Sequence, residues 1–172
     1  MVERLRFLSS VFAIDVCAYA VLANHFHVVL RVDRERAQSW LEAEVIERYG
    51  RLFGLAKGQL ATLDEERAKV EVWRERLWDL SWMMRSLNEW IAGRANREDE
   101  CRGRFWEGRF RCQPLLDEAG LLTCMTYVDL NPVRAGVRDR LDDAEFTTIA
   151  ARLREASACA FHGIVNTRST PS

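Results

Sequence analysis

The spacing of apolar residues changes along the chain, and each change predicts a different kind of element. Residues 3–13 carry apolar side chains three and four positions apart, which predicts a helix. Residues 16–22 and 25–32 are rich in residues that favour strands, and Ala23 and Asn24 separate the two runs. Because asparagine tolerates the left-handed turn region, the two runs predict a β-hairpin.

Helical spacing returns in the middle of the chain. It predicts helices near 34–53, 64–76 and 79–96, followed by a strand or an extended loop over 104–116. A last helix is predicted over about 118–130. The hairpin and the helices together predict an α+β fold, in which a small antiparallel sheet carries several helices.

Asp117 and Pro132 mark the expected ends of the last helix. An aspartate can accept hydrogen bonds from the amides of the first turn, and the residue before a proline avoids the helical region. We expect one domain over residues 1–155, with a helical insertion at about 34–100, and a disordered tail over 156–172.

Composition and charge restrict the class of protein. The 172 residues are 48% hydrophobic and 30% charged, with no long apolar run, so we expect a globular protein without membrane contact. The five cysteines form no CxxC pair, which argues against a disulfide framework or a zinc ribbon and favours the cytoplasm. The net charge is −1, but residues 101–116 hold four arginines against one acid, and such a basic segment attracts a polyanion.

His25 and His27 lie two positions apart in the second predicted strand. Side chains of a strand alternate, so both histidines project from one face, and Phe26, Val28 and Leu30 are expected to form the core on the other. Two imidazoles at this spacing suit the chelation of one metal ion. Histidines that simply face solvent or the core are the alternative.

Tyr127 and Asn131 lie four positions apart in the last predicted helix, so their side chains share one face. Tyr127 offers a phenolic oxygen, and Asn131 offers a neutral oxygen ligand. The opposite, buried face is expected to hold Leu121, Leu122, Met125 and Val128. The alternative makes Tyr127 an ordinary core residue and Asn131 the C-cap of the helix.

Residues 103–111 interleave arginines with Phe105, Trp106 and Phe110. Aromatic rings stack on unpaired bases while arginines neutralise phosphates, and proteins use this combination on single-stranded nucleic acid. An amphipathic strand with a charged outer edge is the alternative.

Taken in order, the three segments resemble the single-tyrosine HUH transposases, in particular the REP-associated tyrosine transposases. Residues 24–30 are similar to the HUH motif, residues 104–106 to an Arg-Phe-Trp signature, and residues 127–136 to the tyrosine helix of that family. The resemblance covers roughly residues 10–150. It implies a ferredoxin-like sheet of the HUH and relaxase type.

The resemblance also implies a function, a metal-dependent endonuclease and transposase that nicks and rejoins single-stranded DNA at palindromic hairpins. His25, His27 and Asn131 would bind Mg²⁺ or Mn²⁺. Tyr127 would attack the phosphate and form a 5′-phosphotyrosine with a free 3′-hydroxyl. The residues expected to contact DNA are Arg102, Arg104, Trp106, Arg109, Arg111 and Arg134.

Members of this family begin with a strand before the first helix, whereas the helix expected here starts at residue 3. The resemblance therefore implies an unpaired sheet edge beside the site. Such an edge is compatible with a homodimer that pairs through the sheet and equally with a monomer. It leaves a second function open, that of a relative that binds hairpin DNA without cleaving it. We assign no chemistry to the helical insertion.

Overall fold

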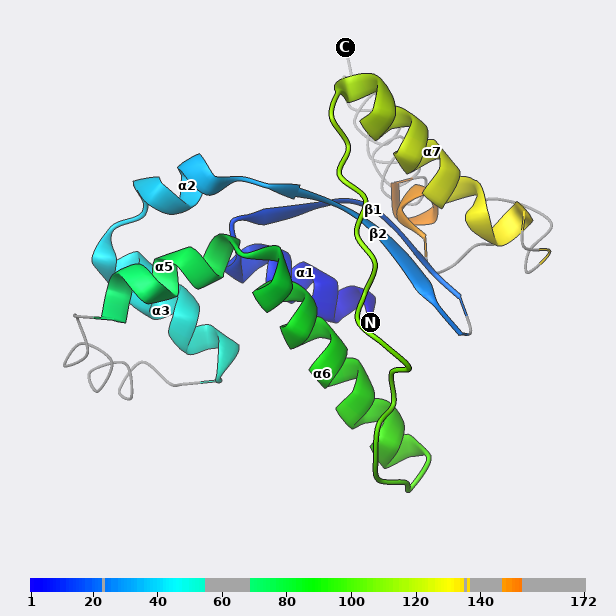
Figure 1. Cartoon of the computed structure of the whole chain (residues 1–172), viewed down its shortest axis with the longest axis horizontal. Coiled ribbons are helices and arrows are strands. Elements are labelled where there is room, and N and C mark those ends of the chain that lie inside the picture. The colour runs from blue at the N-terminus through cyan, green and yellow to red at the C-terminus, as the bar shows by residue number, and fades with distance from the viewer. Residues whose placement is uncertain (23, 55–68, 135, 137–146, 153–172) are drawn as a thin grey trace, which may run out of the picture. The chain divides into compact units, whose positions relative to one another are not determined.

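The fold mixes helices with a two-stranded antiparallel sheet, in the order drawn in Figure 1. A computed structural model describes residues 1–22, 24–54, 69–134, 136 and 147–152. None of the helices in these residues is long and apolar enough to cross a membrane. The tail expected over 156–172 lies outside the described residues.

The chain divides into two compact units, and each unit consists of two separate stretches of sequence. The first unit comprises Met1–Val16 and Leu30–Gln113. The second unit comprises Cys17–Val29 and Pro114–Ser172. The single domain expected over residues 1–155 stays a prediction.

The predicted β-hairpin is confirmed. Its strands are β1 (Ile14–Val21) and β2 (Phe26–Val32), and each strand contributes residues to both units. Beside the turn, the amide of Leu22 donates to the carbonyl oxygen of His25 at 2.9 Å. The turn therefore closes directly before the two histidines, and β2 carries His27 onward from it.

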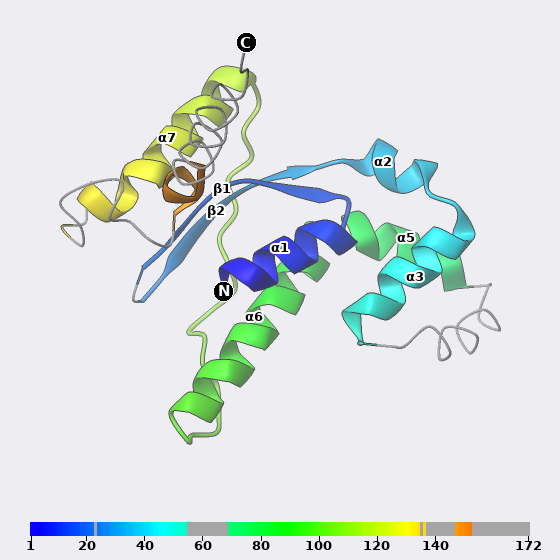
Figure 2. The same cartoon turned by 180° about the vertical axis from the view of Figure 1, so that it is seen from behind.

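Helices make up most of the first unit. They are α1 (Val2–Val11), α2 (Arg34–Ser39), α3 (Glu42–Leu52), α5 (Val70–Trp78) and α6 (Leu80–Glu98). Helix α1 packs against both α3 and α6, and α3 packs against α5 (Figure 1 and Figure 2). The largest side chains buried between these helices include Leu5, Leu8, Phe12, Leu77, Met83 and Leu87. The helices predicted near 3–13 and 79–96 are thereby confirmed.

The single helix predicted near 34–53 is wrong, because the chain breaks between α2 and α3. Trp40 and Leu41 adopt extended backbone angles at the break. The side chain of Arg74, only 6% exposed, donates from Nη1 to the carbonyl oxygens of Ala37 at 2.9 Å and Trp40 at 2.6 Å. The guanidinium of α5 thus donates to two carbonyl oxygens that would accept hydrogen bonds from backbone amides if α2 and α3 were one continuous helix.

Replacing Arg74 with methionine is expected to lower the free energy of unfolding by about 2–4 kcal/mol, because it leaves two buried carbonyl oxygens without a donor. Urea unfolding followed by tryptophan fluorescence measures the change. The matched control is Arg85→Met, which removes an exposed ion pair to Glu89 and a 5.5 Å cation–π contact with Trp82, and should change stability by less than about 1 kcal/mol. Equal effects of the two substitutions would contradict the role of Arg74 as the cap of α2.

The second unit contains α7 (Glu118–Arg134). The predicted cap is confirmed, since the amide of Gly120 donates to Oδ1 of Asp117 at 2.7 Å. The predicted end before Pro132 is wrong, because α7 runs through this proline to Arg134. Pro132 is buried, and packing of the last turn outweighs the local preference of the residue before a proline.

Helix α7 packs on the face of the hairpin that carries the histidines. Val128 forms a buried cluster with Ala18, Ala20 and Val29, and Val29 is only 4% exposed. The small alanines of β1 let the helix approach the strands closely. The expectation of a core on the opposite face is therefore wrong, and the residues expected there are only half-buried: Phe26, Val28 and Leu30.

Part of the outer edge of β1 is paired within the second unit. Ala20 forms an antiparallel bridge with Thr147, and the amide of Tyr19 donates to Oγ1 of Thr148 at 2.5 Å. Among the described residues no further strand pairs with β2. In the described part of the chain, the sheet edge along β1 is thus paired at Ala20, and no pairing is seen along the outer edge of β2.

Candidate functional site

The second unit brings His25, His27 and Tyr127 together from segments far apart in the sequence. The ring centroids of the two histidines lie 5.1 Å apart, and the ring of Tyr127 lies 6.3 Å from that of His27. Tyr127 is 45% exposed, which contradicts the alternative of a core tyrosine. The Tyr127 side chain is therefore partly open to solvent.

The separation of the two histidine rings is compatible with a shared metal ion. Nδ1 of His25 lies 2.7 Å from Oδ1 of Asn24, and an amide oxygen only accepts, so Nδ1 carries the proton and Nε2 keeps its lone pair. A metal–nitrogen distance of about 2 Å places two rings that share an ion within roughly 6 Å of each other, centroid to centroid. The observed separation of the two rings satisfies this limit.

Asn131 supplies an oxygen that nothing else in the described structure uses. Its side chain is 8% exposed, and Oδ1 is buried without a hydrogen-bond partner among the described residues. A buried acceptor without a donor is costly, and a cation is one of the groups that would satisfy it. Asn131 lies inside α7, three residues before its end, which contradicts the alternative of a C-cap.

The chemistry of the site has to be inferred from its own residues, because comparison of the chain with protein-family models, with curated proteins and with solved structures gave no match. In the part of the chain that the structure describes, no three His, Cys, Asp or Glu side chains are grouped to hold an ion. A metal site here accordingly needs the two imidazoles together with the amide oxygen of Asn131.

Arg134 stands beside the candidate nucleophile. Its guanidinium carbon lies 5.2 Å from the centre of the Tyr127 ring, in a cation–π arrangement within α7. This places a permanent positive charge next to the phenol. Of the residues expected to contact DNA, Arg134 is the one that belongs to the same unit as Tyr127.

Burial favours the neutral form of His27. Its pKa is lowered from the usual value of 6.5, mainly because the ring is partly buried and also because His25 lies close by. A neutral imidazole has the free lone pair that metal binding requires, so the environment of His27 favours a ligand over a cation at neutral pH.

The lowered pKa of His27 predicts a loss of stability in mild acid. Above about pH 6.5 both folded and unfolded chains hold this imidazole neutral, and as the pH falls the unfolded chain takes up the proton first. The free energy of unfolding should therefore fall as the pH drops below that value and through the folded pKa. Urea titrations between pH 7.5 and 5 should show a shallower fall for His27→Gln than for the wild type, and parallel curves would contradict the assignment.

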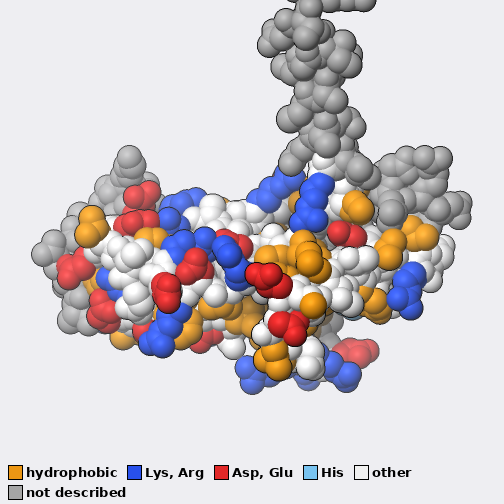
Figure 3. Space-filling model, turned by 90° about the horizontal axis from the view of Figure 1, so that it is seen from above, with side chains coloured by type: hydrophobic (Ala, Val, Ile, Leu, Met, Phe, Trp, Pro, Cys, Tyr) orange, Lys and Arg blue, Asp and Glu red, His pale blue; other side chains and the backbone are white. Residues whose placement is uncertain are grey.

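The other residues expected to contact DNA lie in the first unit, in a segment that forms no strand. Arg102, Arg109 and Arg111 are exposed, and none of them makes an ion pair with a described residue. Arg104 and Trp106 make hydrogen bonds within the protein instead. Figure 3 shows basic and acidic side chains interspersed on the face that it views, so the basic character is local to short segments.

Two residues near the site were missed by the sequence analysis. Asn24 was assigned to the turn and to the stretch similar to the HUH motif without a role of its own, although its position directly before His25 could have indicated a supporting role. Asp129 is 7% exposed, and burial raises the pKa of its carboxyl, which lies 3.8 Å from Arg152 and accepts from the amide of Ile149. Asp129 thus anchors the 147–152 segment to α7.

Leu122, expected to be buried, is 63% exposed.

Proposed function

We propose that the chain is a metal-dependent endonuclease and transposase of the HUH type, which nicks and rejoins single-stranded DNA at palindromic hairpins. The observation that carries the proposal is the approach of the exposed Tyr127 to His27, with 6.3 Å between their rings. The hairpin and α7 would then form part of a ferredoxin-like HUH core. The buried oxygen of Asn131, which has no hydrogen-bond partner among the described residues and lies on the same helix as Tyr127, supports the proposal.

Three side chains of the second unit would hold the ion. Nε2 of His25 is free because Nδ1 donates to Asn24, the neutral form of His27 is favoured, and Asn131 offers its amide oxygen. Mixed nitrogen and oxygen donors suit Mn²⁺ better than Mg²⁺. When bound, the ion would polarise the scissile phosphate and stabilise negative charge on its oxygens.

Tyr127 would act as the nucleophile. A bond forms between its phenolic oxygen and phosphorus while the bond from phosphorus to the 3′-oxygen breaks. The phenolic proton passes to solvent, and the departing 3′-oxygen takes up a proton. One phosphate ester replaces another, so the free 3′-hydroxyl can later reverse the step without ATP. Arg134, beside the ring, would hold the phosphate during both steps.

The test is the formation of a covalent protein–DNA adduct. The full chain is incubated with Mn²⁺ and a DNA hairpin that has single-stranded flanks and a label at its 3′ end. A 5′-phosphotyrosine leaves the labelled 3′ fragment attached to the protein, so a slow band should persist on a denaturing gel and vanish when EDTA is present from the start.

The alternative function predicts a different result. A relative that only binds hairpin DNA would shift the same probe on a native gel and give no band on the denaturing gel. Tight binding without an adduct, across a set of hairpins and with either Mn²⁺ or Mg²⁺, would overturn the proposal of cleavage.

A further inference from the structure

Residues 101–113 of the first unit follow α6 and are fastened to it at several points. The amide of Cys101 donates to the carbonyl of Asn96 at 2.9 Å, and Nδ2 of Asn96 donates to the carbonyl of Gly103 at 3.1 Å. Farther along, Nε1 of Trp106 donates to the carbonyl of Asn88 at 3.0 Å. This segment has no helix or strand of its own, yet a side chain of α6 (Asn96) and a side chain of the segment (Trp106) hold its position.

Arg104 closes a turn within this segment. Its Nε donates to the carbonyl of Trp106 and its Nη2 to the carbonyl of Glu107, both at 2.8 Å. One guanidinium thereby holds two successive backbone carbonyls. The principal work of Arg104 and Trp106 is therefore to build the turn, and this differs from the direct DNA contact expected from the sequence.

The turn displays Phe105. This ring is 42% exposed and meets the edge of Trp106 at 4.8 Å between centroids, with an angle of 88° between planes. The ring of Phe105 is open to solvent and packs against Trp106, which is held by a hydrogen bond to α6. Such a ring is pre-organised to bind a flat partner, because binding then costs little conformational entropy of side chains or loop.

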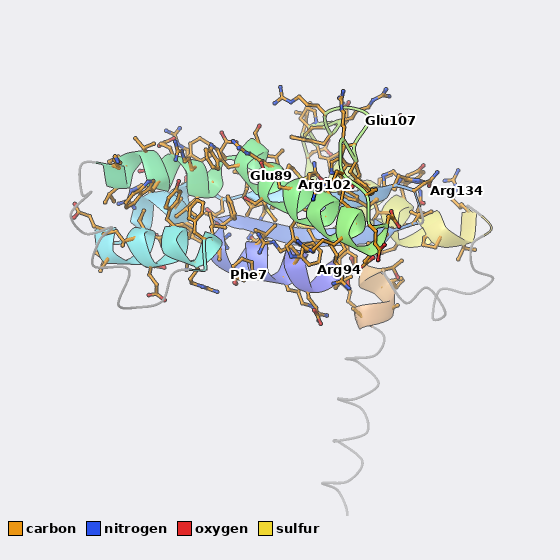
Figure 4. All side chains as sticks on the ribbon, turned by 90° about the horizontal axis from the view of Figure 1, so that it is seen from below. Phe7, Glu89, Arg94, Arg102, Glu107 and Arg134 are labelled. Carbon is orange, nitrogen blue, oxygen red and sulfur yellow. The ribbon has the colours of Figure 1, made fainter. Side chains whose placement is uncertain are left out.

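The charges around the ring suit a polyanion. Arg102, Arg109 and Arg111 are exposed and make no ion pair with any residue that the structure describes, and Glu107 is the one acid between residues 101 and 116. Figure 4 labels Arg102 and Glu107 on this segment, and the side chains around Glu107 point outward. A flat apolar face with arginines on both sides in the sequence matches one unpaired base and its neighbouring phosphates.

We propose that Phe105 is a stacking platform for one unpaired nucleobase, that Arg102 and Arg109 bind the adjacent phosphates, and that Arg104 and Trp106 hold the platform in place. The stacking platform would be a substrate contact of the proposed function. It rests on the proposed function only in that both require binding of single-stranded DNA. Base stacking is an equilibrium property, so it can be measured without cleavage.

The experiment measures the binding of a fluorescein-labelled twelve-nucleotide oligo-dT in EDTA by fluorescence anisotropy. Phe105→Ala should weaken binding roughly 5- to 100-fold, and Phe105→Trp should restore it, because stacking of one base contributes that range of affinity. The matched control is Phe53→Ala, which removes another exposed phenylalanine of the first unit, 60% exposed and also in contact with a neighbouring ring. Phe53→Ala should bind as the wild type does.

Salt dependence and a duplex separate stacking from charge. Phe105→Ala should leave the slope of log affinity against log salt unchanged, whereas Arg109→Gln should reduce it by about one. A blunt duplex should bind the wild type and Phe105→Ala equally, because its bases are already stacked. Wild-type affinity of Phe105→Ala for oligo-dT, or an equal loss on the duplex, would overturn the platform.

Failure of the two proposals would look different. If Phe105→Ala weakens binding of the single strand but no adduct ever forms, the platform stands and cleavage does not. If an adduct forms and Phe105→Ala binds normally, cleavage stands and the platform is refuted.

Discussion

Replacing Tyr127 with phenylalanine is expected to abolish the covalent adduct with DNA, by a factor on the order of 10³ or more, because the attacking oxygen is removed. The ring remains, so its contacts with His27 and Arg134 should survive. Tyr127 is also 45% exposed, and its hydroxyl makes no hydrogen bond with a described residue. Folding and DNA binding should therefore stay as in the wild type, which isolates the chemical step.

Tyr49→Phe is the matched control for this substitution. It removes the hydroxyl of a tyrosine in the first unit, which accepts a hydrogen bond from Arg76 at 2.7 Å. Some stability should be lost there, whereas the yield of adduct on the 3′-labelled hairpin should be retained. An adduct that persists in Tyr127→Phe, with the same metal requirement as the wild type, would show that another residue is the nucleophile.

Replacing Asn131 with alanine should lower the affinity for Mn²⁺ by about 100-fold or more. Loss of a residue that only supports a metal ligand lowers the affinity by about 10- to 100-fold, and loss of a ligand itself should have an effect at or above the upper end of that range. The same substitution should cost little stability in the metal-free protein. Oδ1 of Asn131 has no hydrogen-bond partner among the described residues, so truncation removes a desolvated acceptor and no bond to a described residue. Isothermal titration calorimetry with Mn²⁺ and urea unfolding measure the two quantities.

Asn88 offers a close control for Asn131. Its Oδ1 is likewise buried without a partner in the described structure, but it lies on α6 in the first unit. Asn88→Ala keeps the backbone carbonyl that accepts from Trp106 and should leave Mn²⁺ affinity unchanged. Equal affinities of wild type, Asn88→Ala and Asn131→Ala would remove Asn131 from the ligand set. A stability loss without a change in affinity would make it a packing residue.

Much of the local structure could be predicted because it depends on neighbouring residues. The alternation of residues 25–32 predicted a strand with both histidines on one face; the hairpin is present, but β2 begins at Phe26, so only His27 lies in the strand and His25 directly precedes it. The aspartate before α7 predicted its first turn, and Asp117 does cap it. Periodicity and capping act over a few positions, so the sequence states them directly.

Other features depended on contacts that the sequence does not display. The break at Trp40 follows from Arg74, whose guanidinium takes carbonyls of a helix more than thirty positions earlier. For residues 103–111, the interleaved arginines and aromatic residues predicted a DNA-binding surface. They could not show which residues hold the segment in place and which are free to contact DNA. Hydrogen bonds assign Arg104 and Trp106 to the turn and leave Phe105 exposed.

For the candidate site, the sequence by itself determined the chemical inventory: two imidazoles in register on one strand, and a tyrosine and an asparagine one helical turn apart. Only the tertiary structure decided that α7 covers the histidine face of the hairpin, that Tyr127 lies beside His27, and that the oxygen of Asn131 is buried with no hydrogen-bond partner in the described part of the chain. The physical reason is that alternation places residues on opposite faces of a sheet but does not say which face a helix will bury. That choice belongs to the packing of Val128 against Ala18, Ala20 and Val29, which are distant from α7 in the sequence.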